Sequence, residues 1–215
     1  MRARHAPPLL TCALVGAAAG CAPKARPLVG TRAPASVSLP QVRLPAGRER
    51  VVFRWRYQEP GFSARGDGAA RVAAPDSARL DFFLDGGYGS GWAALVGDAL
   101  RTPDDDVARR LVPPAPPLLW AALGRLSVPP GRDTTLRVSG DTIRADVAGP
   151  STWRVTLAGG ALSSLEHLLA GRVVERLVRT GPAVRYEDVV NRRTLAIDVQ
   201  RREPAGAFPS AIWSR

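Results

Sequence analysis

Val51-Val52-Phe53-Arg54-Trp55-Arg56-Tyr57-Gln58 is the stretch of sequence that decides the fold. Every second residue, beginning with Val51, is apolar and most of these are aromatic, whereas Arg54, Arg56 and Gln58 lie between them. A period of two places successive side chains on opposite faces of a β-strand. This stretch therefore predicts a strand with one buried aromatic face and one charged face exposed to water.

Similar short segments follow along the chain, separated by turns such as Gly97-Asp98 and Gly140-Asp141. Segment 62–74 is rich in glycine and alanine, which predicts a weaker and bent partner strand. Strands joined by tight turns in sequence order are typical of an antiparallel meander. Further strands are expected over 78–84, 93–96, 99–101, 135–139, 142–147, 153–157, 161–168, 172–179, 184–189 and 194–202.

The middle of the chain interrupts this meander with two helical signals. Prolines at 116–117, the apolar run 118–123 and Gly124 predict a short helix that is apolar nearly all round and must be buried. The acidic residues 104–106 are expected to cap a shorter helix that extends through Arg110. Calcium binding is the alternative, but the alternating ligands and central glycine of a calcium loop are missing. The fold class is therefore mainly β, with one or two short helices and a curled antiparallel sheet.

The N-terminus has the layout of an export signal: basic residues, a short apolar run and then Ala18-Ala19-Gly20-Cys21. This ending resembles the lipobox of bacterial lipoproteins, in which the cysteine is acylated and becomes the first residue. We expect a signal over 1–20, lipidation at Cys21 and a disordered tether over the proline-rich residues 22–48. The alternative is an ordinary secreted protein that is cut nearby, with Cys21 as an unmodified thiol.

The length of the chain fits one domain, which is expected over 49–203 and is followed by a tail over 204–215. The chain has only two cysteines, Cys12 and Cys21, so an internal disulfide is not expected. The net charge is +11, which favours contact with anionic lipid or envelope polymer, or is simply a solvated basic surface. Nucleic acid is not expected as a partner of an exported chain, and a monomer is expected.

No catalytic motif is found, and neither a metal nor a cofactor is expected. A serine–histidine–acid relay would have to use His167, for which a strand-end or surface position is the simpler interpretation. Ser90 lacks the glycines that a nucleophile elbow needs two residues away on each side. The sequence also lacks zinc ligands, a phosphate loop and a dinucleotide fingerprint. The chain is therefore not expected to be an enzyme.

Several stretches resemble the bacterial lipoprotein-localisation family of LolA and LolB. They are 53–57, with two arginines between three aromatic residues, the proline and alternating strand of 75–82, the helix and turn of 118–131, and the tryptophan strand 153–157. The resemblance covers residues 49 to 202. It implies a half-barrel of curved antiparallel sheet, covered by helices, around an apolar cavity that receives acyl chains. No clear counterpart of the family's membrane-inserting loop leucine is found, and Trp92 and Leu95 are only candidates for membrane contact.

These observations leave two hypotheses about function. The first is an envelope lipoprotein, anchored in the outer membrane and facing the periplasm, that binds acyl chains of lipids or lipoproteins and takes part in their transfer. The alternative is a structural or assembly lipoprotein that binds another envelope protein through sheet edges or its basic surface. Under the first hypothesis the cavity is lined by Phe53, Trp55, Tyr57, Leu80, Phe82, Leu119, Leu123, Trp153 and Val155. The same side chains would instead pack on the covering helix if the interior were a filled core.

Overall fold

The computed structural model describes residues 22–34, 36–87, 89–103 and 106–213. The predicted signal 1–20 and the lipidation residue Cys21 lie outside the described residues, as do the capping residues 104 and 105. The strands are β1 (Thr31–Arg32), β2 (Arg48–Glu59), β3 (Phe62–Ala73), β4 (Ser77–Leu84), β5 (Ser90–Val96), β6 (Ala99–Arg101), β7 (Asp133–Ser139), β8 (Thr142–Ala148), β9 (Thr152–Ala158), β10 (Ala161–Leu169), β11 (Arg172–Thr180), β12 (Ala183–Asp188) and β13 (Arg193–Pro204).

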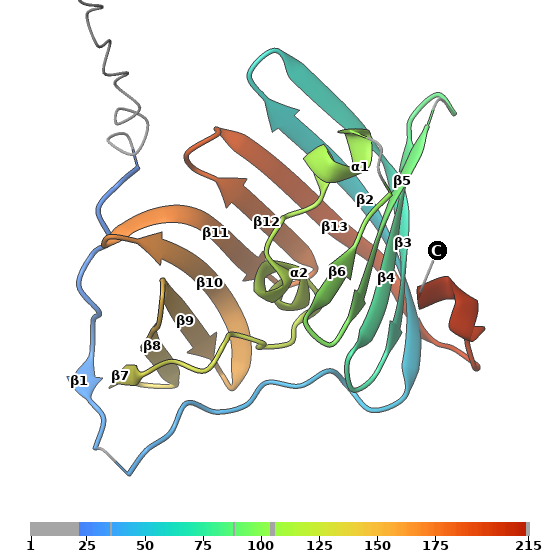
Figure 1. Cartoon of the computed structure of the whole chain (residues 1–215). Helices are drawn as coiled ribbons and strands as arrows, with labels where there is room; N and C mark the ends of the chain where they lie inside the picture. The colour runs from blue at the N-terminus through green and yellow to red at the C-terminus, as the bar shows by residue number, and fades with distance from the viewer. Residues whose placement is uncertain (1–21, 35, 88, 104–105, 214–215) are drawn as a thin grey trace, which may run out of the picture.

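The described strands form one antiparallel sheet of 13 strands, in the order β1-β7-β8-β9-β10-β11-β12-β13-β2-β3-β4-β5-β6. The meander therefore runs in two sections, which join where the last strand, β13, pairs with β2. β1 and β6 are the two edges, so the sheet curls without closing, and the helices lie on its inner side (Figure 1). The predicted fold class, a mainly β half-barrel covered by helices, is confirmed.

β2 has the alternation expected from its sequence. Phe53, Trp55 and Tyr57 are buried on the inner face, whereas Arg54 and Arg56 are exposed on the outer face. Two rings of this strand lie opposite glycines of β3, because Phe53 pairs with Gly68 and Trp55 with Gly66. A Cβ atom at Gly68 would lie 2.2 Å from Cε2 of Phe53. Gly68 thus gives the ring of Phe53 room to lie across β3, whereas a Cβ at Gly66 would meet the backbone of Phe83.

The register brings apolar side chains from eight strands into one continuous row on the inner face. Each member pairs directly with the next, and all are buried. The row runs through Tyr57, Leu195, Tyr186, Leu177, Leu165, Val155, Ala145 and Leu136. Because paired residues in a sheet share a face, this row makes the inner side of the half-barrel apolar from β2 to β7.

Both predicted helices are present. α2 (Pro116–Leu123) has prolines in its first turn and ends at Gly124, whose φ of 95° is left-handed. Six of its eight residues are buried, which confirms that the helix is covered on most sides. α1 (Asp106–Leu111) precedes it and packs beside β5. α2 lies over the inner face of the sheet (Figure 1).

The described residues of 22–48, expected to form a disordered tether, make main-chain contacts with the sheet. Lys24 forms a β-bridge with Arg172, and the N–H of Ala25 donates to the carbonyl of Gly171. β1 then pairs with β7, and the carbonyl of Val42 accepts a hydrogen bond from the N–H of Leu126. These contacts use main-chain groups, which a side-chain pattern does not reveal. The segment follows the outside of the half-barrel from β11 to β7 and continues to β2 (Figure 1).

Gly30 is expected to be essential for the attachment of this N-terminal arm (residues 22–48). Its φ is +118°, and an added Cβ would lie 2.7 Å from the carbonyl oxygen of Val138 in β7. Gly30→Ala should lift the arm and raise amide hydrogen exchange at Ala25 and Ala33 by about tenfold or more, since local opening sets exchange. Gly47→Ala is the matched control, because Gly47 also has a positive φ but no atom within 4 Å of the added Cβ. Unchanged exchange in Gly30→Ala would contradict this role.

The C-terminal segment covers the outer face of the opposite end of the sheet. It contains the short 3-10 helix η2 (Ser210–Trp213), which packs on β4 and β5. Arg79 of β4 donates to the carbonyl of Ile212 at 3.0 Å, and the rings of Phe208 and Trp213 meet edge to face. Both faces of β5 are therefore covered, by α1 on the inner side and by η2 on the outer side.

Candidate functional site

The structure brings all nine predicted cavity residues into one buried cluster. They come from β2, β4, β9 and α2, and each is between 0 and 8% exposed. Strands β9 and β2 are far apart in sheet order but face a common interior because the sheet curls. The nine residues therefore share the buried, inner side of the sheet.

The aromatic part of this lining is closely packed. The ring of Phe82 meets the rings of both Phe53 and Trp55 edge to face, with centroids 5.6 and 5.8 Å away. The indole Nε1 of Trp55 donates a hydrogen bond to the carbonyl of Asp67 at 2.9 Å. These contacts hold the three aromatic side chains against one another inside the buried cluster.

The nine predicted cavity residues are only part of the lining. Leu165, Leu177, Tyr186 and Leu195 complete the inner row, and Trp120 of α2 is fully buried above the sheet. β10 carries a bulge between Leu162 and Ser164 and another between His167 and Leu168. Each bulge shifts the alternation by one residue, so the inner residues of this strand do not follow a simple period of two.

The indole N–H of Trp120 is the polar side-chain group of α2, and hydrogen bonds to groups outside the helix hold it in place. The indole Nε1 of Trp120 donates to the carbonyl of Gly97 at 2.8 Å. The guanidinium of Arg179 donates to the carbonyls of Ala121 and Ala122 at the C-terminal end of the helix, which is the end that favours a cation. Burial, with a further contribution from the charge of Arg202, lowers the pKa of Arg179.

A polar cluster closes the inner face beside α1. The hydroxyl of Tyr57 donates to Glu59 at 2.9 Å, and Glu59 also pairs with Arg193 at 3.4 Å and Arg110 at 3.5 Å. Burial, followed by the hydrogen bond to Glu59, raises the pKa of Tyr57 above its ordinary value. The phenol therefore remains a neutral donor, and Arg110 connects α1 to the strand that carries the aromatic lining.

His167 lies in a second polar cluster at the other end of the inner face. Its Nε2 lies 2.9 Å from Oγ of Ser151, its Nδ1 lies 2.9 Å from Glu175, and its ring stacks on Trp153 at 4.4 Å. The hydroxyl of Tyr186 donates to the same Glu175, and burial raises the pKa of Tyr186. Of the two expected positions, strand end or surface, His167 lies near the end of β10, and its side chain is only 18% exposed. The cluster satisfies polar groups beside the apolar row.

One membrane-contact candidate is wrong and the other is partly covered. Leu95 is fully buried, because α1 covers the inner face of β5. Trp92 points to the outer face, where the guanidinium of Arg79 lies 4.5 Å from its ring centroid. The large apolar side chains that are most exposed in the described chain lie elsewhere, among them Val29, Phe83 and Leu169. In the described residues no helix has the length and apolarity to cross a membrane, and no group of three or more possible metal ligands is found.

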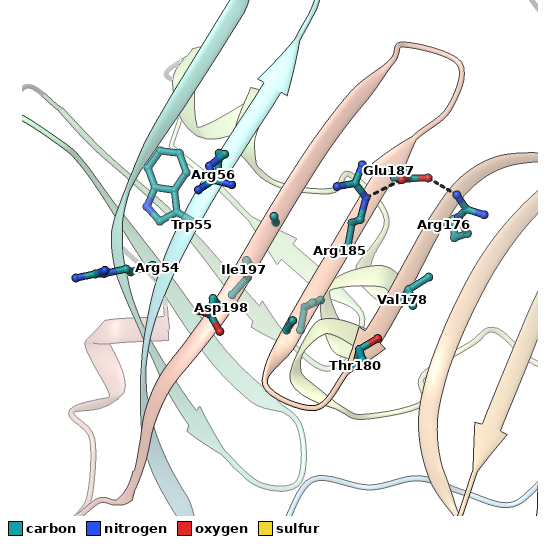
Figure 2. Close-up of a pocket in the computed structure, with 13 residues that line it drawn as sticks. Arg54, Trp55, Arg56, Arg176, Val178, Thr180, Arg185, Glu187, Ile197 and Asp198 are labelled. Carbon is teal, nitrogen blue, oxygen red and sulfur yellow. Dashed lines mark hydrogen bonds and ion pairs between the residues drawn. The ribbon is translucent and has the colours of Figure 1, made fainter.

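The outer face contains a groove of about 650 Å³ that the sequence did not predict. It crosses β2, β13, β12 and β11, on the side of the sheet opposite α2 (Figure 2). Arg54 and Arg56 border it on β2, and Arg185 and Arg176 border it on β12 and β11. Its floor is made of small side chains, because the register places Ala196 between Arg56 and Arg185.

The fold and the two faces define a class of protein: an open antiparallel half-barrel with an apolar interior under a short helix. No family model and no curated protein matches this sequence. Among solved structures, the fold is similar to a LolA superfamily protein from Nitrosomonas europaea, with 10% identity, coverage of 80% of this chain and 92% of that chain, and a TM-score of 0.49.

A DUF1329 family protein from Desulfovibrio piger is 9% identical over 78% of this chain and 90% of that chain, with a TM-score of 0.43. A chain of the MucA/MucB complex from Pseudomonas aeruginosa is 12% identical over 76% of this chain and 55% of that chain, with a TM-score of 0.26. At these identities the likeness concerns the fold alone.

Proposed function

We propose that this protein is a cell-envelope lipoprotein that binds acyl chains between the inner face of its half-barrel and α2. The observation that carries the proposal is the inner face itself: an apolar row crosses eight strands and is covered by a helix of only eight residues. Cys21 would carry the lipid anchor, and the outer membrane facing the periplasm is the proposed location. The proposed role is binding and transfer, without catalysis.

α2 is suited to move because little of its stability is its own. Isolated helices shorter than about 12 residues are marginal in water, so α2 depends on packing and on the hydrogen bonds from Trp120 and Arg179. Segments of this kind open locally at a lower cost than the unfolding of the whole domain. Opening α2 would expose the aromatic lining without breaking the sheet.

The free energy that the buried side chains of α2 contribute is comparable to the free energy that a buried acyl chain would contribute. Four large buried side chains of α2 contribute on the order of 6 to 12 kcal/mol, at about 1.5 to 3 kcal/mol each. An acyl chain of about 16 carbons, at about 0.8 kcal/mol for each buried methylene, contributes on the order of 12 kcal/mol. A bound chain can therefore replace the contacts that α2 loses when it moves.

Native mass spectrometry of protein purified from membranes tests this proposal. The expected result is two separate additions to the mass: a covalent one at Cys21 and a noncovalent one that corresponds to a fatty acid or phospholipid. Leu119→Arg should remove the second addition and leave the first, because it places a charge in the apolar interior. Ala122→Arg on the same helix is the control, since Ala122 is only partly buried. Protein that carries no noncovalent lipid in any preparation would contradict the proposal.

A further inference from the structure

We infer that the outer groove is a second binding site, which takes an extended acidic segment of a partner protein. It lies on the face opposite α2, so it is separate from the proposed acyl-chain site. Its volume of about 650 Å³ lies within the range of specific ligand sites. Trp55 borders the groove as well as the inner cluster, but it is buried. The inference does not depend on acyl-chain binding, because the arginines that carry it lie on the outer face.

The register explains why a groove exists on an otherwise ordinary sheet face. Arg56, Ala196, Arg185 and Val178 form one cross-strand row, and Arg54, Asp198, Ala183 and Thr180 form the next. Each row therefore has one alanine in its two middle strands, Ala196 in β13 or Ala183 in β12, beside the longer side chain of Arg185 or Asp198. The result is a low apolar floor with arginine side chains standing on two sides.

The arginines differ in how far they are already paired. Glu187 accepts hydrogen bonds from both Arg185 and Arg176 (Figure 2). Its partial burial acts to raise its pKa, but the hydrogen bonds and charges of the two arginines prevail and hold the pKa below its ordinary value. Arg54 lies 3.7 Å from Asp67, and both side chains are largely exposed. Arg56 is exposed and has no hydrogen-bond or ion-pair partner within the described part of the chain.

The positions of these charges select the occupant. Arg56 and Arg185 lie two strands apart, which is about 10 Å and equals about three residues of extended chain. Guanidinium groups bind carboxylates through paired hydrogen bonds. An occupant therefore needs negative charge at both ends and small or apolar groups between them. An extended peptide with acidic residues on either side of small ones meets this requirement, whereas a lipid headgroup offers its charge at one end.

The test begins with a displayed library of random short peptides, selected against the full-length protein. Acidic residues should be enriched at two positions separated by small residues. The best peptide, labelled with a fluorophore, should bind about tenfold more weakly when its acidic residues are replaced by their amides. It should also bind more weakly when the salt concentration is raised. Selected peptides without acidic residues would overturn the inference.

Variants of the protein locate the binding. Ala196→Trp should abolish binding by filling the floor, and Arg56→Gln should weaken it about tenfold by removing the unpaired charge. Arg132→Gln is the control, because Arg132 is exposed at a distant turn. Melting temperatures equal to that of the unchanged protein would exclude misfolding, and acyl-chain binding should be unaffected. Peptide binding that survives Ala196→Trp would overturn the inference. A protein that binds no peptide, and whose variants instead lose binding to phosphatidylglycerol vesicles, would overturn it as well.

Discussion

Trp120→Ala is expected to lower the free energy of unfolding by about 3 to 5 kcal/mol, the usual cost of truncating a buried tryptophan. Trp120 is fully buried in α2, and its Nε1 donates to the carbonyl of Gly97. The change therefore leaves a large cavity between the helix and the sheet, and also an unpaired carbonyl. Arg125, whose guanidinium lies 4.4 Å from the indole centroid, loses its stacking partner as well.

Urea denaturation measures this effect. Trp92→Ala is the matched control, because Trp92 is partly exposed on the outer face and contacts Arg79 through a cation–π interaction. Its loss should cost only about 1 kcal/mol. Equal losses for the two variants would show that α2 does not pack on the sheet as described.

Trp55→Ala is expected to have a destabilising effect of similar size, about 3 to 5 kcal/mol. Trp55 is 3% exposed, packs edge to face on Phe82 and donates to the carbonyl of Asp67. Trp55→Phe should cost less, since it keeps most of the ring volume and loses mainly the hydrogen bond. The exposed neighbour Arg56 is the control, because Arg56→Ala should change stability by less than about 0.5 kcal/mol.

The two hypotheses about the interior predict different effects of a ligand on Trp55→Ala. If the inner face binds acyl chains, an added chain should fill part of the new cavity and recover part of the lost stability by mass action. A filled core that never opens would show the same loss with and without the ligand. Melting temperatures measured with increasing fatty-acyl probe separate these outcomes.

The strands and α2 could be predicted because their side chains carry a local pattern. Alternation in 51–58 and proline and glycine at the ends of 116–124 determine local structure directly, and both were found as expected. The N-terminal arm could not be predicted, because Lys24 and Ala25 are held by main-chain pairing with β11. Such pairing leaves no trace in hydrophobicity.

The errors in site residues have a similar cause. Leu95 lies in a short strand whose residues 93–95 are all buried, since both faces of β5 are covered there. An apolar run without alternation does not show which faces of a strand are covered. The groove depends on which residues of β2, β13, β12 and β11 lie side by side, and this follows from register over distances of more than one hundred residues.

The most direct test of acyl-chain binding under α2 is titration of the delipidated protein with a fluorescent fatty-acyl probe, with melting temperature followed in parallel. The proposed function predicts saturable binding of the probe and a melting temperature that rises with its concentration. Leu119→Arg should remove both effects, whereas Ala196→Trp in the outer groove should change neither. A delipidated protein that stays folded, binds no probe and melts at the same temperature at every probe concentration would contradict the proposed function.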